Sequence, residues 1–306
     1  MVQSATNNVK IAIRILDTSP ESVDTVKSGL KLAWHGEEPQ SSTPIIGADP
    51  VWSSTPPRGL AFWEVLHAII QEEPVRTEDK AWMAMLKPLG IEKGQPFEPD
   101  ARQTAILTRG AIMGELMARN MQTNPRFTEP WWEGTSWYKS FDLSVPQITE
   151  ERVELDERAV WFYEAVGSSE GMVNPQPGVG QVYMTTKRDS NGDLLRADRT
   201  YRLSLPADVP VANFWSLTLY SSETRRPYDN GPELTDASLD SRMEQLKVNE
   251  DGSVDLFIGP EAPEGMESNH MATVGDDGWF VYFRLYGPEE PFFDKSFALP
   301  DFEPVD

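Results

Sequence analysis

The spacing of apolar residues changes along the chain from the period of a helix to the period of a strand. Between residues 60 and 120, apolar side chains recur three or four positions apart, which is the pattern of amphipathic helices. Asp100 and Gln103 have the spacing of a capping box and mark the clearest helix start. We expect helices beginning near Leu60, Thr77, Asp100 and Thr149, the last of them ending near Val166.

After about residue 170 the apolar positions alternate with a period of two, or run together in short β-rich segments. The segments are residues 181–187, 200–205, 213–220, 254–258 and 279–286. Turn dipeptides separate them, as between strands of an antiparallel sheet. The sequence therefore predicts an α+β fold, in which a helical domain is followed by an antiparallel jelly-roll-like β-sandwich. We expect a remnant of an N-terminal domain with its linker over 1–55, the helical domain over 56–166 and the sandwich over 167–306.

Charge and composition narrow the range of partners. Lys and Arg number 27 and Asp and Glu 49, so the net charge is −22. The acidity is concentrated after residue 150, where the net charge is −17 against −5 before it. Such a field repels nucleic acid and anionic lipid, and no apolar stretch approaches the roughly 20 residues that cross a bilayer. We expect no nucleic-acid or membrane partner, while a homo-oligomer is compatible with the sequence.

Two further features bear on location and chemistry. The first ten residues lack the charged and then apolar arrangement of an export signal, which suits a cytoplasmic chain as given and leaves the native compartment open. There is no cysteine, which excludes disulfides, thiolate nucleophiles and cysteine-ligated metals.

Four segments resemble bacterial proteins that pair the domains DUF1254 and DUF1214. They are GIEKGQPFEPD (90–100), FWSLTLY (214–220) with Thr224 and Arg225 after it, DGSVDLFIGP (251–260) and GWFVYFRLYGPEEPFFDKSF (278–297). The resemblance covers about residues 55–306 and implies a jelly-roll-like C-terminal domain, with most of the DUF1254 domain absent. Relatives often carry an export signal. The family has no established reaction, so the resemblance implies a fold and no mechanism.

Recognised catalytic strings are absent from the sequence. No G-x-S-x-G, H-E-x-x-H or P-loop string is present, which excludes the usual serine hydrolases, zincins and NTPases. The three histidines are His35, His67 and His270. His67 lies among apolar neighbours and is expected to be structural, whereas His270, in a loop of the β-domain, is the one best placed to meet a ligand.

Two acidic turns resemble calcium-binding loops. Residues 189–193 and 249–255 carry alternating oxygen side chains, but the position of the terminal glutamate of an EF-hand is occupied by Thr200. Asn-Gly and Asp-Gly between β-rich segments are hairpin signals, so we interpret both as turns. We expect no metal and no cofactor.

The strongest candidate site combines arginine and tyrosine at strand ends. Tyr220, Arg225, Arg284 and Tyr286 belong to this set, and Arg284 and Tyr286 point to the same face of one strand. An arginine flanked by tyrosine can bind a carboxylate or a hydroxyl-rich ligand through its planar fork. The alternative is an internal ion pair with an acid such as Asp294. The long loop over residues 221–242 is expected to border the site.

Glu164 and Glu170 are a second candidate, as the paired carboxylates of a glycosidase. Two functions stay open from the sequence. The first is a small-molecule or carbohydrate-binding β-sandwich protein, with or without hydrolase activity. The second is a non-catalytic structural or assembly protein, in which the same aromatic and charged residues only make contacts between domains or subunits.

Overall fold

The computed structural model describes residues 5–8, 17, 19–31, 33, 36–38, 55–140, 147–165, 175–230 and 237–305. The chain divides into two compact units, Met1–Met113 and Gly114–Asp306. The boundary expected between residues 166 and 167 lies outside the described residues, so the proposed domain limits stay a prediction.

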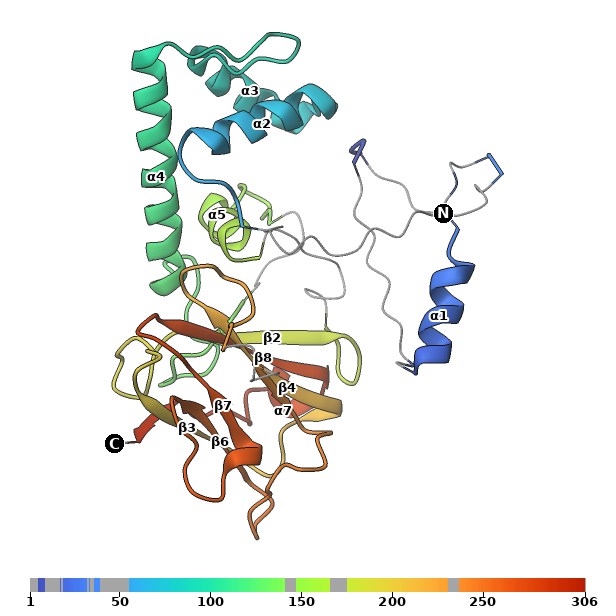
Figure 1. Cartoon of the computed structure of the whole chain (residues 1–306), viewed down its shortest axis with the longest axis vertical. Coiled ribbons are helices and arrows are strands. Elements are labelled where there is room, and N and C mark those ends of the chain that lie inside the picture. The colour runs from blue at the N-terminus through green and yellow to red at the C-terminus, as the bar shows by residue number, and fades with distance from the viewer. Residues whose placement is uncertain are drawn as a thin grey trace. The chain divides into compact units, whose positions relative to one another are not determined.

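The first unit is helical in its described part. It contains α1 (Pro20–Gly29), α2 (Leu60–Glu72), α3 (Lys80–Leu86) between two short 3-10 turns (Thr77–Asp79 and Lys87–Leu89), and the start of α4 (Ala101–Thr123) (Figure 1). The capping box is present, because Gln103 N donates to Asp100 Oδ1 at 2.7 Å and Asp100 N to Gln103 Oε1 at 3.1 Å. Trp63 of α2 donates its indole N–H to the Leu107 carbonyl of α4 at 2.7 Å, which joins the two helices.

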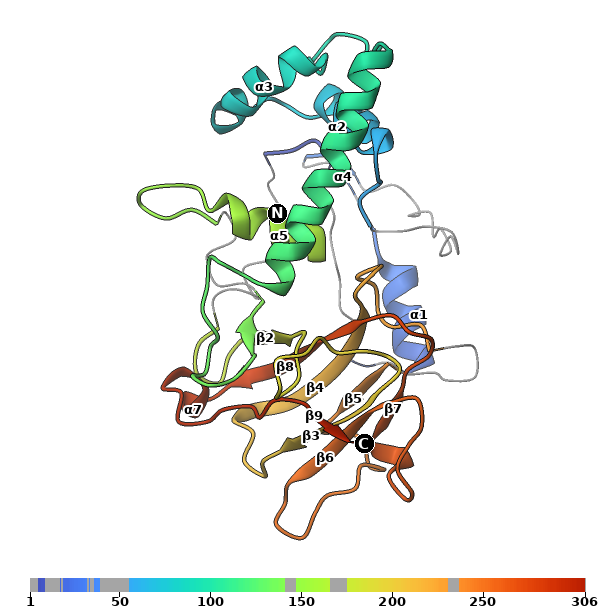
Figure 2. The same cartoon turned by 90° about the vertical axis from the view of Figure 1, so that its left-hand side faces the viewer.

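The second unit contains two sheets. The five-stranded sheet has the order β1 (Tyr138–Lys139), β2 (Gln181–Thr186), β8 (Trp279–Pro288), β4 (Val211–Ser221), β5 (Ser238–Asp240) (Figures 1 and 2). The four-stranded sheet has the order β7 (His270–Ala272), β6 (Val254–Gly259), β3 (Thr200–Leu205), β9 (Glu303–Val305). This unit also contains the part of α4 from Gly114 onward and the short helical segments α5 (Leu155–Glu164), η3 (Glu267–Asn269) and α7 (Glu290–Phe293).

The α+β class is therefore confirmed, with one difference in strand direction. Neighbouring strands are antiparallel except β6 and β7, which are parallel. The jelly-roll order stays a prediction. The helix expected from about residue 149 was wrong at its start: Thr149 closes a local turn by accepting the Arg152 N–H at 3.1 Å, and α5 begins only at Leu155.

None of the helices in the described part of the chain is both long and apolar enough to span a bilayer.

The core of the second unit lies between the two sheets, because one face of each carries the alternating apolar residues. On β8 these are Trp279, Val281, Phe283 and Leu285, each at most 1% exposed. They meet Tyr201 and Leu203 of the opposite sheet in one cluster, which also takes in Trp132 and Trp137 from the segment before β1. The opposite face of β8, with Phe280, Tyr282, Arg284 and Tyr286, turns away from this core.

Candidate functional site

The face of the five-stranded sheet that turns away from the core, called here the outer face, gathers polar and aromatic side chains because of strand register. Arg284 pairs with Tyr183 of β2 and Ser216 of β4, and Tyr282 pairs with Thr185 and Thr218. Residues directly opposite each other in an antiparallel pair share a face. The register therefore surrounds Arg284 with hydroxyl groups.

Arg284 is half-buried and is held by neutral groups. Its Nη1 donates to Thr218 Oγ1 at 2.7 Å and its Nη2 to the Tyr220 hydroxyl at 2.6 Å. The rings of Tyr183, Tyr282 and Tyr220 lie 5.2, 5.4 and 5.8 Å from its guanidinium carbon. Burial acts to lower the pKa of Arg284, but the tyrosine hydroxyls act more strongly to raise it, so the pKa is raised and the group stays charged.

No carboxylate neutralises Arg284 among the described residues: it forms no ion pair there within 4.0 Å. The expected alternative partner, Asp294, instead accepts the Ser296 N–H at 2.8 Å in a local turn. This ion pair does not form because the side chain of Arg284 lies on the outer face, whereas Asp294 belongs to the segment after α7. Two of the five N–H donors of the guanidinium are used, and the other three have no acceptor in this part of the structure.

Arg225 has a different environment. It has a left-handed backbone with φ of 57°. Its Nη1 donates to the Glu223 carbonyl at 2.5 Å and its Nε to the Tyr163 carbonyl at 3.2 Å, and the guanidinium lies 4.1 Å from the centre of the Tyr163 ring. Arg225 therefore binds the C-terminal end of α5, where a cation is favourable. The structure does not bring it together with Arg284.

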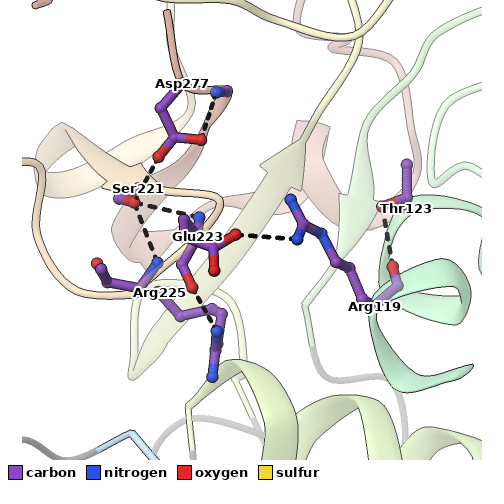
Figure 3. A network of polar contacts seen from close by, with 8 residues as sticks. Arg119, Thr123, Ser221, Glu223, Arg225 and Asp277 are labelled. Carbon is purple, nitrogen blue, oxygen red and sulfur yellow. Dashed lines mark hydrogen bonds and ion pairs between the residues drawn. The ribbon is translucent and has the colours of Figure 1, made fainter. Parts of the chain in front are cut away.

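The loop around Arg225 is tied down by a polar network (Figure 3). Ser221 Oγ donates to Asp277 at 3.0 Å and accepts the backbone N–H groups of Glu223 and Thr224 at 3.2 and 3.1 Å. Arg119 of α4 forms an ion pair with Glu223 at 2.9 Å. These contacts fix the turn that follows β4.

Tyr286 lies two residues after Arg284 on β8 and on the same outer face. Its ring stacks on Phe214 with 4.0 Å between ring centres, and the Arg242 guanidinium covers Phe214 at 3.7 Å. Arg242 is itself paired with Asp240, at 3.1 and 3.2 Å. This arginine therefore differs from Arg284 in having its own carboxylate.

Glu164, at the end of α5, is buried against the outer face with both oxygens occupied. Its Oε1 accepts the Tyr282 hydroxyl, and its Oε2 accepts Gln122 at 2.6 Å and lies 3.4 Å from Lys187 Nζ. Burial and the neighbouring carboxylate raise the pKa of Tyr282 well above its usual range. Glu170 lies outside the described residues, so the proposed carboxylate pair has one placed member.

The remaining sequence candidates have local roles where they are described. His67 stacks on Phe97 and bonds the Gln95 carbonyl at 2.9 Å, while His35 lies outside the described residues. His270 is half-buried against the Gly259 carbonyl at 2.9 Å, and burial lowers its pKa.

The two acidic segments have turn geometry. Asp189 Oδ1 accepts the N–H groups of Asn191 and Asp193 at 2.9 and 3.0 Å, and Asp251 accepts that of Ser253 at 3.0 Å. In the described ranges no group of three His, Asp or Glu side chains is arranged to hold a metal ion.

Sequence reasoning missed Tyr183, Lys187, Thr218 and Tyr282 of the outer face, and Gln122 of α4, which binds Glu164 against it. Alternation within each strand could have assigned Tyr183, Thr218 and Tyr282 to one face. Their meeting depends on the register between strands far apart in sequence, which alternation within a strand does not provide.

A hollow of about 530 Å³ opens beside the turn after β4. It is lined by Ser221, Thr224, Arg226, Pro227, Tyr228, Asp229, Val274 and Asp277. Six of these eight residues belong to the long loop over residues 221–242, which was expected to border the Arg284 site. Ser221 pairs with Trp279, five residues before Arg284 on β8, or about 17 Å along the strand, so the hollow and Arg284 are separate places.

Comparison with solved structures gives low-identity similarities. The chain is similar to the VPA0106 protein of Vibrio parahaemolyticus, with 16% identity, a TM-score of 0.44, and coverage of 89% of this chain and 60% of that one. It is also similar to an uncharacterised protein of Burkholderia cenocepacia, with 14% identity, a TM-score of 0.32, and coverage of 75% and 51%. The chain thus spans about half to three-fifths of the length of these proteins.

No curated protein matches the chain. A family model does match part of it: residues 180–290, from just before β2 to the start of α7. This segment contains Tyr220, Arg225, Arg284 and the loop that lines the hollow. The part of the chain that carries the candidate site therefore matches DUF1214, a family whose description is a protein of unknown function.

Proposed function

We propose that this protein binds a small molecule carrying a carboxylate, and that Arg284 on the outer face is the anchor. The observation that carries the proposal is the unneutralised charge of Arg284. A half-buried cation without an opposite charge is costly, and here it persists in a chain with 49 acidic residues. A ligand carboxylate would supply the missing charge.

The geometry around Arg284 favours a planar or ring-shaped acid. Three N–H donors of a guanidinium fork can bind a carboxylate through two parallel hydrogen bonds. Tyrosine rings border the fork, and their faces can stack on an aromatic ring or on the apolar face of a sugar. Aromatic acids and sugar acids such as uronic acids are therefore the ligand class we propose. The carbohydrate-binding hypothesis is therefore kept for sugars that carry a carboxylate.

Hydrolysis finds less support than binding. The Glu164 side chain is 3% exposed and already bound to Tyr282, Gln122 and the cation Lys187, so this carboxylate is closed to a sugar. A hydrolase role would depend on Glu170, the other carboxylate of the candidate pair. The structural or assembly role is the alternative, in which Arg284 only ties strands together through Thr218 and Tyr220.

A thermal-shift screen tests the proposal. Glucuronate, galacturonate, benzoate and 4-hydroxybenzoate are compared with glucose and galactose, which lack the carboxylate. A ligand at a hundred times its Kd stabilises the folded state by about 2.7 kcal/mol, or a rise of roughly 5–10 °C in a domain of this size. We expect at least one acid to raise Tm and its neutral counterpart to leave Tm unchanged.

Substitutions then assign the effect to Arg284. Arg284→Lys keeps the charge but loses the planar fork, so it should keep the fold and lose the acid-induced shift. Arg242→Lys is the matched control, because Arg242 lies on the same face but already has Asp240 as its partner. If no acid raises Tm, while Arg284→Ala unfolds the protein at a much lower temperature, the structural alternative holds.

A further inference from the structure

The hollow beside the turn after β4 has charges of both signs that the protein itself leaves unneutralised. Arg226 is exposed, and within the described ranges its side chain makes neither a hydrogen bond nor an ion pair; only its backbone does, through Thr224 Oγ1 and the Ser221 N–H. All five of its donors are therefore available.

Asp277 provides the negative charge in the same hollow. Its Oδ1 accepts the Gly278 N–H at 2.8 Å and its Oδ2 accepts the Ser221 hydroxyl at 3.0 Å. Both partners are neutral, and no cation lies within 4.0 Å of it among the described residues. A carboxylate has about four acceptor positions, so Asp277 can still accept from a ligand ammonium group.

Part of the wall of the hollow is apolar. Pro227, Tyr228 and Val274 line it, beside the polar Ser221 and Thr224 and a second carboxylate, Asp229. Tyr228 is 7% exposed, and its hydroxyl donates to the Val274 carbonyl at 2.8 Å, which ties the two sides of the hollow together. The left-handed backbone of Arg225 and the network around Ser221 hold the turn in place. A preformed wall lowers the entropy lost when a ligand binds.

From these features we propose that the hollow binds a free α-amino acid with an apolar side chain, its carboxylate on Arg226, its ammonium group on Asp277 and its side chain on the Pro227, Tyr228 and Val274 wall. A volume of about 530 Å³ is within the range of small-molecule sites. The hollow shares no contact with Arg284, so this proposal is independent of acid binding on the outer face.

Isothermal titration calorimetry of the full chain with L-leucine tests the proposal. Three analogues that each lack one feature of leucine serve as comparisons. N-acetyl-leucine has no ammonium group, and leucinamide has no carboxylate. Glycine has both charges but no side chain. We expect L-leucine to bind in the millimolar range or tighter, glycine to bind about tenfold more weakly, and the two single-charge analogues not to bind at the same concentrations. No heat with L-leucine, or equal affinity for N-acetyl-leucine, would overturn it.

Variants of Arg226 and Asp277 test which residue binds each charged group of leucine. Arg226→Gln should weaken leucine binding by about tenfold or more without lowering Tm, because this side chain has no partner to lose. Arg199→Gln, a change of the same charge at an exposed arginine outside the hollow, should leave binding intact.

Asp277→Asn keeps an acceptor for Ser221 and should also weaken binding. Should it fail to fold, the leucine analogues still decide the ammonium contact on the unmodified protein. Unchanged affinity in Arg226→Gln would overturn the proposal, and retained leucine binding in Arg284→Lys would separate it from the proposed function.

Discussion

Lys187 and Glu164 form an ion pair inside the second unit, with Lys187 Nζ 3.4 Å from Glu164 Oε2 and side chains 12% and 3% exposed. Tyr282 and Gln122 complete the hydrogen bonds of the carboxylate. Desolvation offsets much of the attraction in such a pair, so its net contribution to stability is small. Its loss is nevertheless damaging, because either partner alone would be a buried uncompensated charge.

The first prediction concerns this pair. Glu164→Ala should lower the free energy of unfolding by about 3–5 kcal/mol, because Lys187 loses its carboxylate and Tyr282 its acceptor. The double variant with Lys187→Met should recover part of the loss. Urea unfolding followed by circular dichroism measures both. A double variant whose loss equals the sum of the two single losses would contradict the coupling.

The second prediction concerns alkaline pH. The pKa of Tyr282 is raised well above its ordinary value of 10.0, first by burial and then by Glu164. The folded state therefore keeps this proton at a pH where the unfolded state releases it. The stabilising contribution is complete below about pH 10 and is lost as the pH rises further. Burial also raises the pKa of Tyr163, Tyr201 and Tyr228, with the same sign.

Stability measured between pH 8 and 11 tests this second prediction. We expect the free energy of unfolding to fall as the pH passes about 10, and Tyr282→Phe to make the fall shallower because one titrating group is removed. The variant will be less stable overall, since Glu164 loses a donor. An equal slope in both proteins would show that Tyr282 does not contribute.

The sequence predicted the long elements well because their patterns repeat. Strands β2, β3, β4, β6 and β8 begin or end within about two residues of the expected segments, and the Asp100 capping box is present. The strands β1, β5, β7 and β9 were missed because each has two or three residues, too few for alternation to be recognised. β7 also pairs in parallel, against the antiparallel pattern expected.

The candidate site was predictable only in part. Alternation placed Arg284 and Tyr286 on one face, and Tyr220 of the neighbouring strand does reach Arg284. The direction of Arg225 was not predictable, because a positive φ at an arginine follows no sequence pattern and turns the side chain toward α5. The contacts of Glu164 depend on how α5 packs on the sheet, which is a tertiary property.

The third prediction compares two glycines. A Cβ at Gly259 would lie 2.6 Å from Thr200 Oγ1 and 2.7 Å from Thr200 Cα, so the paired strands β3 and β6 would have to move apart. Gly259→Ala should therefore destabilise the protein by about 1–3 kcal/mol. A Cβ at Gly114 of α4 would meet nothing within 4 Å, and Gly114→Ala should stabilise the helix by up to about 1 kcal/mol. Thermal unfolding of the two variants should give shifts of opposite sign, and a fall in Tm for Gly114→Ala would show that this helix face is more closely packed than the structure indicates.

The last prediction separates the two arginines that the sequence grouped together. Arg225 donates to the carbonyls of Glu223 and Tyr163 and stacks on the Tyr163 ring, so its contacts are all internal. Lysine at this position would keep the charge but could not reach both carbonyls while lying flat on the ring.

We expect Arg225→Lys to lower the free energy of unfolding by about 1.5–3 kcal/mol, the value of a lost charged hydrogen bond, and to leave acid binding unchanged. Arg284→Lys weakens hydrogen bonds to Thr218 and Tyr220, so it should also lower Tm, but it differs from Arg225→Lys in that the acid-induced shift should be gone. Measuring Tm with and without the best acid from the screen gives both quantities for each variant. If Arg225→Lys abolished the acid-induced shift at constant Tm, Arg225 would be the ligand anchor and the assignment to Arg284 would be wrong.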